Sequence, residues 1–203
     1  MDIKEQIQAA AFDMFSQYGI KRVSMDDIAG KAGISKRTLY GFFEDKEALL
    51  VEGIGHRHDL LKAFWDDLLK GSHTAVDIIL MIYDEIMKNP RFYCQRFYED
   101  LNKYPKAVRR KEHEKEAFIK RCTQLLNQGL KEGVFRKEVN FEIVALLAKE
   151  QINMIQPSKT FCKHSNTEVF DTVLVTFLRG VCTEKGCQIL DKWINVKENI
   201  NHD

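Results

Sequence analysis

Side chains that donate hydrogen bonds are concentrated in one short stretch near the start of the chain. Lys36, Arg37, Thr38 and Tyr40 fall within five successive positions, and Lys46 follows six residues later. Donors of this kind contact the phosphate oxygens of a nucleic acid, and some also contact the edges of its bases. Leu39, which interrupts the donors, is expected to point the other way, into a core. The stretch is therefore typical of a helix face that contacts DNA.

Two short capped helices are needed to hold these donors in place. Ser24 is a suitable helix N-cap, and Asp27 stands three residues later, in the capping-box position and near the positive end of the helix. Gly33 can adopt the positive φ angle that often ends a helix, Ile34 is expected to fill the angle between the helices, and Ser35 can cap the second one. This order predicts a helix-turn-helix unit, whose second helix enters a major groove.

A longer pattern surrounds the donors. Its residues are Ile28-Ala29, Ala32-Gly33-Ile34-Ser35, Thr38-Leu39-Tyr40, Phe43, Lys46 and Leu49. In order and spacing the pattern resembles the DNA-binding domain of the TetR family of bacterial transcriptional repressors. The aromatic pair followed by lysine and leucine makes the resemblance more specific than a helix-turn-helix alone. It is strong over roughly the first 50 residues, and the rest of the chain matches in length and helix pattern.

The resemblance implies which residues touch DNA. Tyr40 and Lys46 look like the family's phosphate-contacting pair, and the start of the second helix would face base edges or phosphates. Gly41 stands where many relatives carry a larger side chain, so the operator sequence cannot be read from this chain. The alternative is that these are ordinary solvated surface residues. The predicted DNA-contacting set is Ser24, Ser35, Lys36, Arg37, Thr38, Tyr40 and Lys46.

The charge of the chain is a weak argument against a nucleic-acid partner. The formal net charge is +1, whereas nucleic-acid-binding domains are often strongly basic. The first 49 residues hold seven basic and eight acidic residues. The positions of the charged residues offset this balance, because the local electrostatic potential governs docking to DNA. Several of the acidic residues are expected at helix N-termini. The basic residues expected to gather at one end are Lys21, Arg22, Lys36, Arg37 and Lys46.

Apolar residues recur at three- and four-residue spacing along the chain, and no strand pattern is seen. The 203 residues, 44% of them hydrophobic, can bury a full core. We expect an all-α protein of about nine to ten helices in two domains: a helix-turn-helix DNA-binding domain at 1–48 and a helical ligand-binding and dimerisation domain at 49–203. Beyond the two short helices, the expected helices are 3–18, 46–69, 74–88, 91–103, 106–131, 141–155, 169–183 and 187–197.

The sequence lacks the features of a membrane or secreted protein. No run of about 18 apolar residues is present, and the first residues lack the basic-then-apolar shape of a signal peptide. Five scattered cysteines without a CxxC pair fit a reducing compartment. We therefore expect a soluble, cytoplasmic protein. His56 and His58 would point to different sides of a helix, so no metal site is expected, and no cofactor is implied.

Aromatic and methionine residues are frequent among the central helices. Such a set could line a cavity, and the resemblance implies that a small molecule binds there and releases the DNA. The same spacing is more often plain core, so no single member is decisive. Tyrosine and methionine with few buried charges favour an aromatic or lipophilic ligand. The predicted lining residues are Trp65, Met81, Tyr83, Ile86, Tyr93, Phe97, Tyr98, Phe118, Cys122 and Met154.

A palindromic operator requires two recognition helices about 34 to 36 Å apart, and hence a homodimer. The resemblance implies a four-helix bundle made from the last two long helices of each subunit, which here are 141–155 and 169–183. An apolar stripe on these helices, which a monomer would expose, is expected to form the interface. The predicted interface residues are Val144, Leu147, Ile155, Val173, Phe177, Leu178 and Val181.

These observations lead to one functional hypothesis and two alternatives. The hypothesis is a homodimeric repressor that a small molecule releases from its operator. The first alternative is an effector-free regulator or activator of the same fold, whose C-terminal core would be filled. The second is a small helical enzyme that carries the N-terminal motif. No nucleophile–base arrangement or glycine-rich phosphate loop supports an enzyme, so no catalytic residue is assigned.

Overall fold

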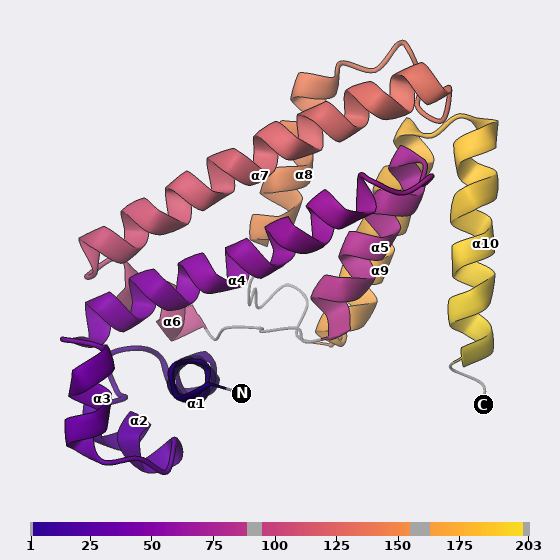
Figure 1. Ribbon diagram of the computed structural model, residues 1–203. Helices are drawn as coiled ribbons and strands as arrows, with labels where there is room; N and C mark the ends of the chain where they lie inside the picture. Colours follow the sequence, from indigo (N-terminus) through magenta and orange to yellow (C-terminus); the bar gives the residue numbers. More distant parts are fainter. Residues whose placement is uncertain (1, 89–94, 155–162, 201–203) are drawn as a thin grey trace. The chain divides into compact units, whose positions relative to one another are not determined.

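The chain is helical throughout the part that the structure describes. The computed structural model (Figure 1) describes residues 2–88, 95–154 and 163–200. Within those ranges it contains no strand, although Phe135 and Cys182 form an isolated bridge. The all-α fold predicted from the sequence is confirmed. The helices are α1 Ile3–Tyr18, α2 Met25–Lys31, α3 Lys36–Phe42, α4 Lys46–Leu68, α5 Ala75–Lys88, α6 Gln95–Leu101, α7 Pro105–Glu132, α8 Phe141–Met154, α9 Asn166–Val181 and α10 Glu184–Ile200.

The last two helices begin three residues earlier than predicted. α9 begins at Asn166 because the hydroxyl of Ser165 accepts a hydrogen bond from the Glu168 backbone N–H at 3.1 Å, which caps the helix. α10 begins at Glu184, where the hydroxyl of Thr183 accepts a hydrogen bond from the Gly186 backbone N–H at 3.3 Å. Polar residues that were expected to form loops therefore start both helices.

The described residues form two compact units. The first contains residues 2–60 and 95–116, and the second contains 61–88, 117–154 and 163–200. α4 and α7 contribute their first parts to the first unit and their last parts to the second. The predicted domain boundary after residue 48 falls inside α4, and it stays a prediction of where the DNA-binding module ends.

The first unit is held together by apolar side chains from its first four helices. Ile7 and Phe15 of α1, Ile28 of α2, Leu39 of α3 and Leu49 of α4 have no exposed surface. Burial of such a side chain stabilises a fold by roughly 1.5–3 kcal/mol. α1 contacts both α2 and α6, and α2 contacts α3. The short helix α3 is thus fixed to a well-packed base.

A close approach between α4 and α1 gives a stability prediction. A Cβ atom at Gly53 would lie 2.1 Å from Cε2 of Phe12. Gly53→Ala is expected to lower the free energy of unfolding by about 1–3 kcal/mol, because the ring must shift within a packed core. Gly30→Ala in α2 is the control, since its Cβ would meet nothing within 4 Å and alanine is the better helix former. Urea denaturation that found both variants equally stable would contradict the close approach.

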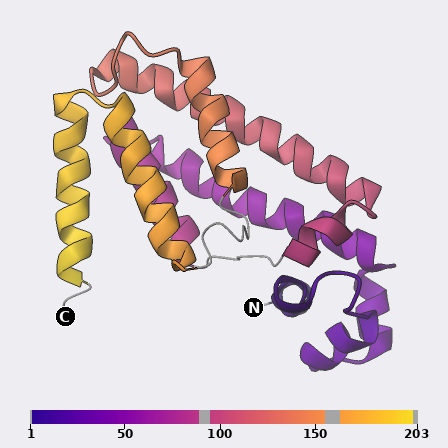
Figure 2. The same ribbon diagram turned by 180° about the vertical axis from the view of Figure 1, so that it is seen from behind.

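In the second unit, α10 lies beside α5 and α9 in both views (Figures 1 and 2), and it contacts both of them. Ile78 of α5, Leu178 of α9 and Leu190 of α10 are almost completely buried between them. Phe135 is buried in the same core, and it follows Gly133, whose φ of +72° lets the chain turn after α7. The second unit therefore has a core of its own.

Candidate nucleic-acid interface and ligand cavity

α2 begins with the capping arrangement that the sequence predicts. The Ser24 hydroxyl accepts a hydrogen bond from the Asp27 backbone N–H at 3.1 Å, and the Asp27 carboxylate accepts one from the Ser24 backbone N–H at 2.8 Å. Hydrogen bonds from Ser24 to this carboxylate lower the pKa of Asp27. The charged carboxylate therefore stays at the positive end of α2.

A tight turn follows and aims α3. Gly33 has a φ of +66°, a conformation that costs glycine little because it has no Cβ. The Ile34 backbone N–H donates to the Ala29 carbonyl at 3.0 Å and closes the end of α2. Ser35 then caps α3, because its hydroxyl accepts a hydrogen bond from the Thr38 backbone N–H at 3.1 Å. The chain therefore passes directly from one capped helix into the next.

α3 has one buried face and one exposed polar face. Leu39 is fully buried, whereas Lys36, Arg37 and Tyr40 are exposed, Tyr40 by 51%. The Lys36 ammonium lies 2.5 Å from an Asp26 carboxylate oxygen, and this hydrogen bond together with the charge of Asp26 raises the pKa of Lys36. The predicted donors of α3 thus share the solvent side of one helix, with one of them already paired to an acid of α2.

Lys46 begins α4 and is held more firmly than the donors of α3. Its ammonium donates to the Ile20 carbonyl at 3.0 Å, and the side chain is partly buried. Burial lowers the pKa of Lys46, while the charges of Asp100 and Asp27 oppose this shift. Its ammonium therefore also ties α4 to the loop that follows α1. Contact of Lys46 with phosphate stays a prediction.

The second unit contains a cavity of about 230 Å³ between α4, α5, α7, α8 and α9. Five of the residues predicted from the sequence line it: Trp65, Tyr83, Ile86, Phe118 and Cys122. Trp65 and Phe118 meet edge to face, with their ring centroids 5.7 Å apart. The lining residues that were not predicted are Ile79, Ile82, Met87, Leu125, Leu126, Ala145, Phe170, Val173, Leu174, Phe177 and Leu178.

Other predicted lining residues lie elsewhere. Phe97 and Tyr98 of α6 pack in the core of the first unit, because α6 lies against α1 there. Met81 is on α5 but two residues from Ile79 and Tyr83, which turns its side chain to a different face of the helix. The predictions for Tyr93, and for the side chain of Met154, fall outside the described residues.

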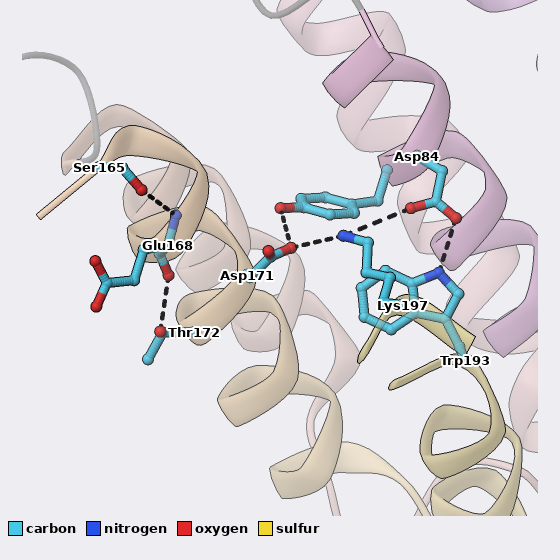
Figure 3. Close-up of polar contacts among 8 residues, drawn as sticks. Asp84, Ser165, Glu168, Asp171, Thr172, Trp193 and Lys197 are labelled. Carbon is cyan, nitrogen blue, oxygen red and sulfur yellow. Dashed lines mark hydrogen bonds and ion pairs between the residues drawn. The ribbon is translucent and has the colours of Figure 1, made fainter. Parts of the chain in front are cut away.

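The cavity offers almost no polar group to a ligand. Among the described residues that line it none is charged. The Tyr83 hydroxyl donates to an Asp171 carboxylate oxygen at 2.7 Å (Figure 3), and burial and this hydrogen bond raise the pKa of Tyr83. Burial also raises the pKa of Cys122 to about 12, so its thiol is neutral near pH 7. The hydroxyl of Tyr83 is therefore already bonded within the protein, and the wall is suited to an uncharged apolar molecule.

The predicted dimer residues fall into three groups. Leu147 is 52% exposed on α8, and two further apolar residues of that helix, Ile143 and Leu146, are exposed beside it. Val173 and Phe177 of α9 line the cavity. Val144, Leu178 and Val181 are buried in the core of the second unit, where Leu178 also lines the cavity, so the reason given for them, that a monomer would expose them, is wrong. Ile155 lies outside the described residues.

Two features are absent from the described part of the chain. None of its helices is long and apolar enough to cross a membrane. Nor do histidine, cysteine, aspartate and glutamate side chains gather there in a group that could hold a metal ion.

Comparison with known proteins decides the family. Residues 7–52 match the family described as "Bacterial regulatory proteins, tetR family". The HTH-type transcriptional regulator RutR of Escherichia coli is 40% identical over 97 residues, which cover 45% of this chain and 46% of RutR. The chain carries the DNA-binding domain of the TetR family. It is thus a transcriptional regulator that binds DNA through its helix-turn-helix, in a family that is not enzymatic.

Solved structures of transcriptional regulators have the same fold over most of the chain. The ketosteroid transcriptional regulator KstR2 of Mycobacterium tuberculosis is 22% identical, with a TM-score of 0.66, and the match covers 90% of this chain and 96% of KstR2. A regulator from Saccharomonospora viridis in complex with choline is 16% identical, with a TM-score of 0.71 and coverage of 89% and 98%. At these identities the likeness concerns the fold.

Proposed function

We propose that this TetR-family protein is a homodimeric repressor that binds an inverted-repeat operator through α3 and is released by a small apolar molecule. The observation that carries the DNA-binding part is the exposed polar face of α3 opposite the buried Leu39. In this arrangement Arg37 reads a base edge in the major groove, since a guanidinium can form two hydrogen bonds to guanine. Lys36, Thr38 and Tyr40 contact phosphates, which fix the register of the helix on the duplex.

The two capping serines act mainly by fixing where α2 and α3 begin. The hydroxyls of Ser24 and Ser35 are already bonded to backbone N–H groups of α2 and α3. Their first role is to hold the helix starts, at about 1 kcal/mol each. Lys46 adds a positive charge next to the same surface and would have to share its ammonium between phosphate and the Ile20 carbonyl.

Dimerisation is proposed to use the exposed side of α8. Ile143, Leu146 and Leu147 present adjoining apolar surface, and a soluble monomer rarely leaves such a patch uncovered. A two-fold axis would bring the same patch of a second copy against it. The two α3 helices can then reach successive major grooves on one side of the duplex.

The effector is proposed to be an uncharged, largely apolar molecule. One structural relative is a ketosteroid transcriptional regulator, and another was solved in complex with choline. The uncharged, mostly hydrocarbon lining of the cavity favours the first of these two chemistries. An effector-free regulator is the alternative, and the cavity of about 230 Å³ argues against the filled core that it requires.

A ligand-release assay tests the proposed response. Fluorescence anisotropy of labelled operator DNA is measured while uncharged apolar compounds or quaternary ammonium compounds are added. The apolar compounds should release the DNA, since a ligand acts only through different affinities for the two conformations. Ala145→Leu extends a side chain into the cavity and should weaken this response while leaving DNA binding intact. Release by neither class would leave the effector-free alternative.

Removing the acid beside Lys36 should strengthen DNA binding. Asp26→Asn keeps the shape of the side chain and removes a negative charge 2.5 Å from the Lys36 ammonium. Affinity should rise several-fold for each subunit, because the removed charge repels phosphate, and the gain should be equal for all DNA sequences. Asp67→Asn is the control, because Asp67 is paired with Lys70 at an exposed site of the second unit. Equal affinities of the two variants would argue against this surface as the DNA contact.

A further inference from the structure

A lysine near the end of α10 is enclosed by two carboxylates and two aromatic rings. The Lys197 ammonium lies 2.8 Å from an Asp171 oxygen of α9 and 3.8 Å from an Asp84 oxygen of α5 (Figure 3). It is 4.8 Å from the centre of the Tyr83 ring and 4.3 Å from the centre of the Trp193 ring. We call these four residues around Lys197 the Lys197 cage.

The Lys197 cage joins α5, α9 and α10. The Trp193 indole N–H donates to the second Asp84 oxygen at 2.7 Å, so α10 is attached to α5 at two neighbouring points. The Lys197 side chain is only 31% exposed, which strengthens its attraction to the rings and carboxylates relative to an open surface pair. The polar contacts that hold the last turns of α10 to α5 and α9 are therefore made by Lys197 and Trp193.

Tyr83 belongs to both the cage and the cavity. Its ring contributes to the cavity wall, while its hydroxyl donates to the same Asp171 oxygen that contacts Lys197. Side chains in a packed wall cannot move alone, because interiors have little free volume. A molecule that presses on the ring from the cavity must therefore disturb the hydrogen bond to Asp171 and the position of the ring under Lys197.

We propose that the Lys197 cage couples the cavity to α10: an occupant displaces the Tyr83 ring, weakens the hold of Asp171 and Tyr83 on Lys197, and loosens the end of α10. The proposal rests on the ligand-binding cavity of the proposed function and adds the element that responds to it. α9 carries both Asp171 and several cavity residues, so the same displacement acts on a helix of the predicted dimer bundle.

The two tryptophans of the chain report on the two ends of this coupling. Trp65 lines the cavity and Trp193 is part of the cage. In the full-length chain, Trp193→Phe leaves Trp65, whose fluorescence reports on the cavity. Trp65→Phe leaves Trp193, whose fluorescence reports on the Lys197 cage. Each variant is titrated with cyclooctanol, an uncharged saturated ring that does not absorb light at the excitation wavelength of indole. Both emissions should change as cyclooctanol saturates the cavity, and that of Trp193 should move to longer wavelength.

The possible outcomes separate the coupling from the proposed function. A response of Trp65 without one of Trp193 overturns the coupling and leaves the ligand cavity standing. No response of Trp65 overturns both. A Trp193 response of undiminished size in a background of Ala145→Leu, where the cavity is smaller, would mean direct binding at the cage and would also overturn the coupling.

A second variant tests the coupling from the cage side. Because coupling between two sites is reciprocal, a cage that is already weakened must make the cavity bind more tightly. Lys197→Met keeps the apolar stem and removes the charge, so the half-saturating cyclooctanol concentration should fall by about fivefold or more. Lys192→Met, at an exposed lysine of the same helix, is the control and should match the unmodified chain. Equal affinities of the two variants would refute the coupling.

Discussion

Arg37→Ala is expected to abolish most of the preference for operator over unrelated DNA. Arg37 is exposed on α3 beside the capped start of the helix, where a side chain reaches the base edges of the major groove. The loss should be about 1–3 kcal/mol in each half-site, which is roughly fivefold to 150-fold for each subunit. Affinity for unrelated DNA should fall much less, since that binding depends on phosphate contacts.

Lys36→Ala is the matched comparison on the same face of α3. It should weaken binding to operator and unrelated DNA by the same factor and reduce the salt dependence by about one unit of slope for each subunit. Gel-shift titrations of both variants at several salt concentrations separate the two roles. If Arg37→Ala also weakened all sequences equally, Arg37 would be a phosphate contact and base reading would have to come from another residue.

Leu147→Asp is expected to separate the subunits and, as a consequence, to abolish tight operator binding. In the proposed dimer this leucine is covered by the partner, so the substitution buries an unpaired charge twice across the two-fold axis. A cost of about 3 kcal/mol or more for each subunit, and so about 6 kcal/mol for the dimer, raises the dimer dissociation constant by at least about ten-thousandfold. The folded monomer should keep its stability, because Leu147 is already 52% exposed in it.

Analytical ultracentrifugation measures this change directly. Leu69→Asp is the control, since Leu69 is another exposed leucine of the second unit but lies outside α8. The control should sediment as a dimer and bind operator normally. A dimeric Leu147→Asp protein would exclude the exposed face of α8 as the interface, and a monomeric unmodified chain at micromolar concentration would exclude the homodimer altogether.

The local geometry around α3 could be predicted from the sequence because it depends on neighbouring residues. Ser24 and Asp27 cap each other within four residues, and Ser35 accepts a hydrogen bond from the backbone N–H of Thr38 three residues later. Ser165 and Glu168 carried a similar signal for the start of α9. It was missed because the surrounding segment is polar, although serine followed three residues later by glutamate is itself a helix start.

The cavity and the dimer surface could be predicted only in part, because apolar residues at helical spacing look alike whatever they face. Phe177 lines the cavity, Leu178 is buried in the core and Leu147 is exposed, yet all three continue an apolar stripe. Phe97 fits a cavity equally well by sequence, but α6 packs against α1 and takes it into another core. Which helix a stripe meets depends on contacts between residues far apart in the chain.

Equilibrium binding to selected and scrambled DNA tests the central claim most directly. Duplexes that the protein retains from a randomised pool should contain an inverted repeat with half-sites about one or two helical turns apart. At physiological salt the retained sequence should bind about a thousandfold more tightly than a scrambled duplex of equal length, with an affinity that falls steeply as salt is added. Equal affinity for the two duplexes at every salt concentration would contradict the account of a sequence-specific repressor.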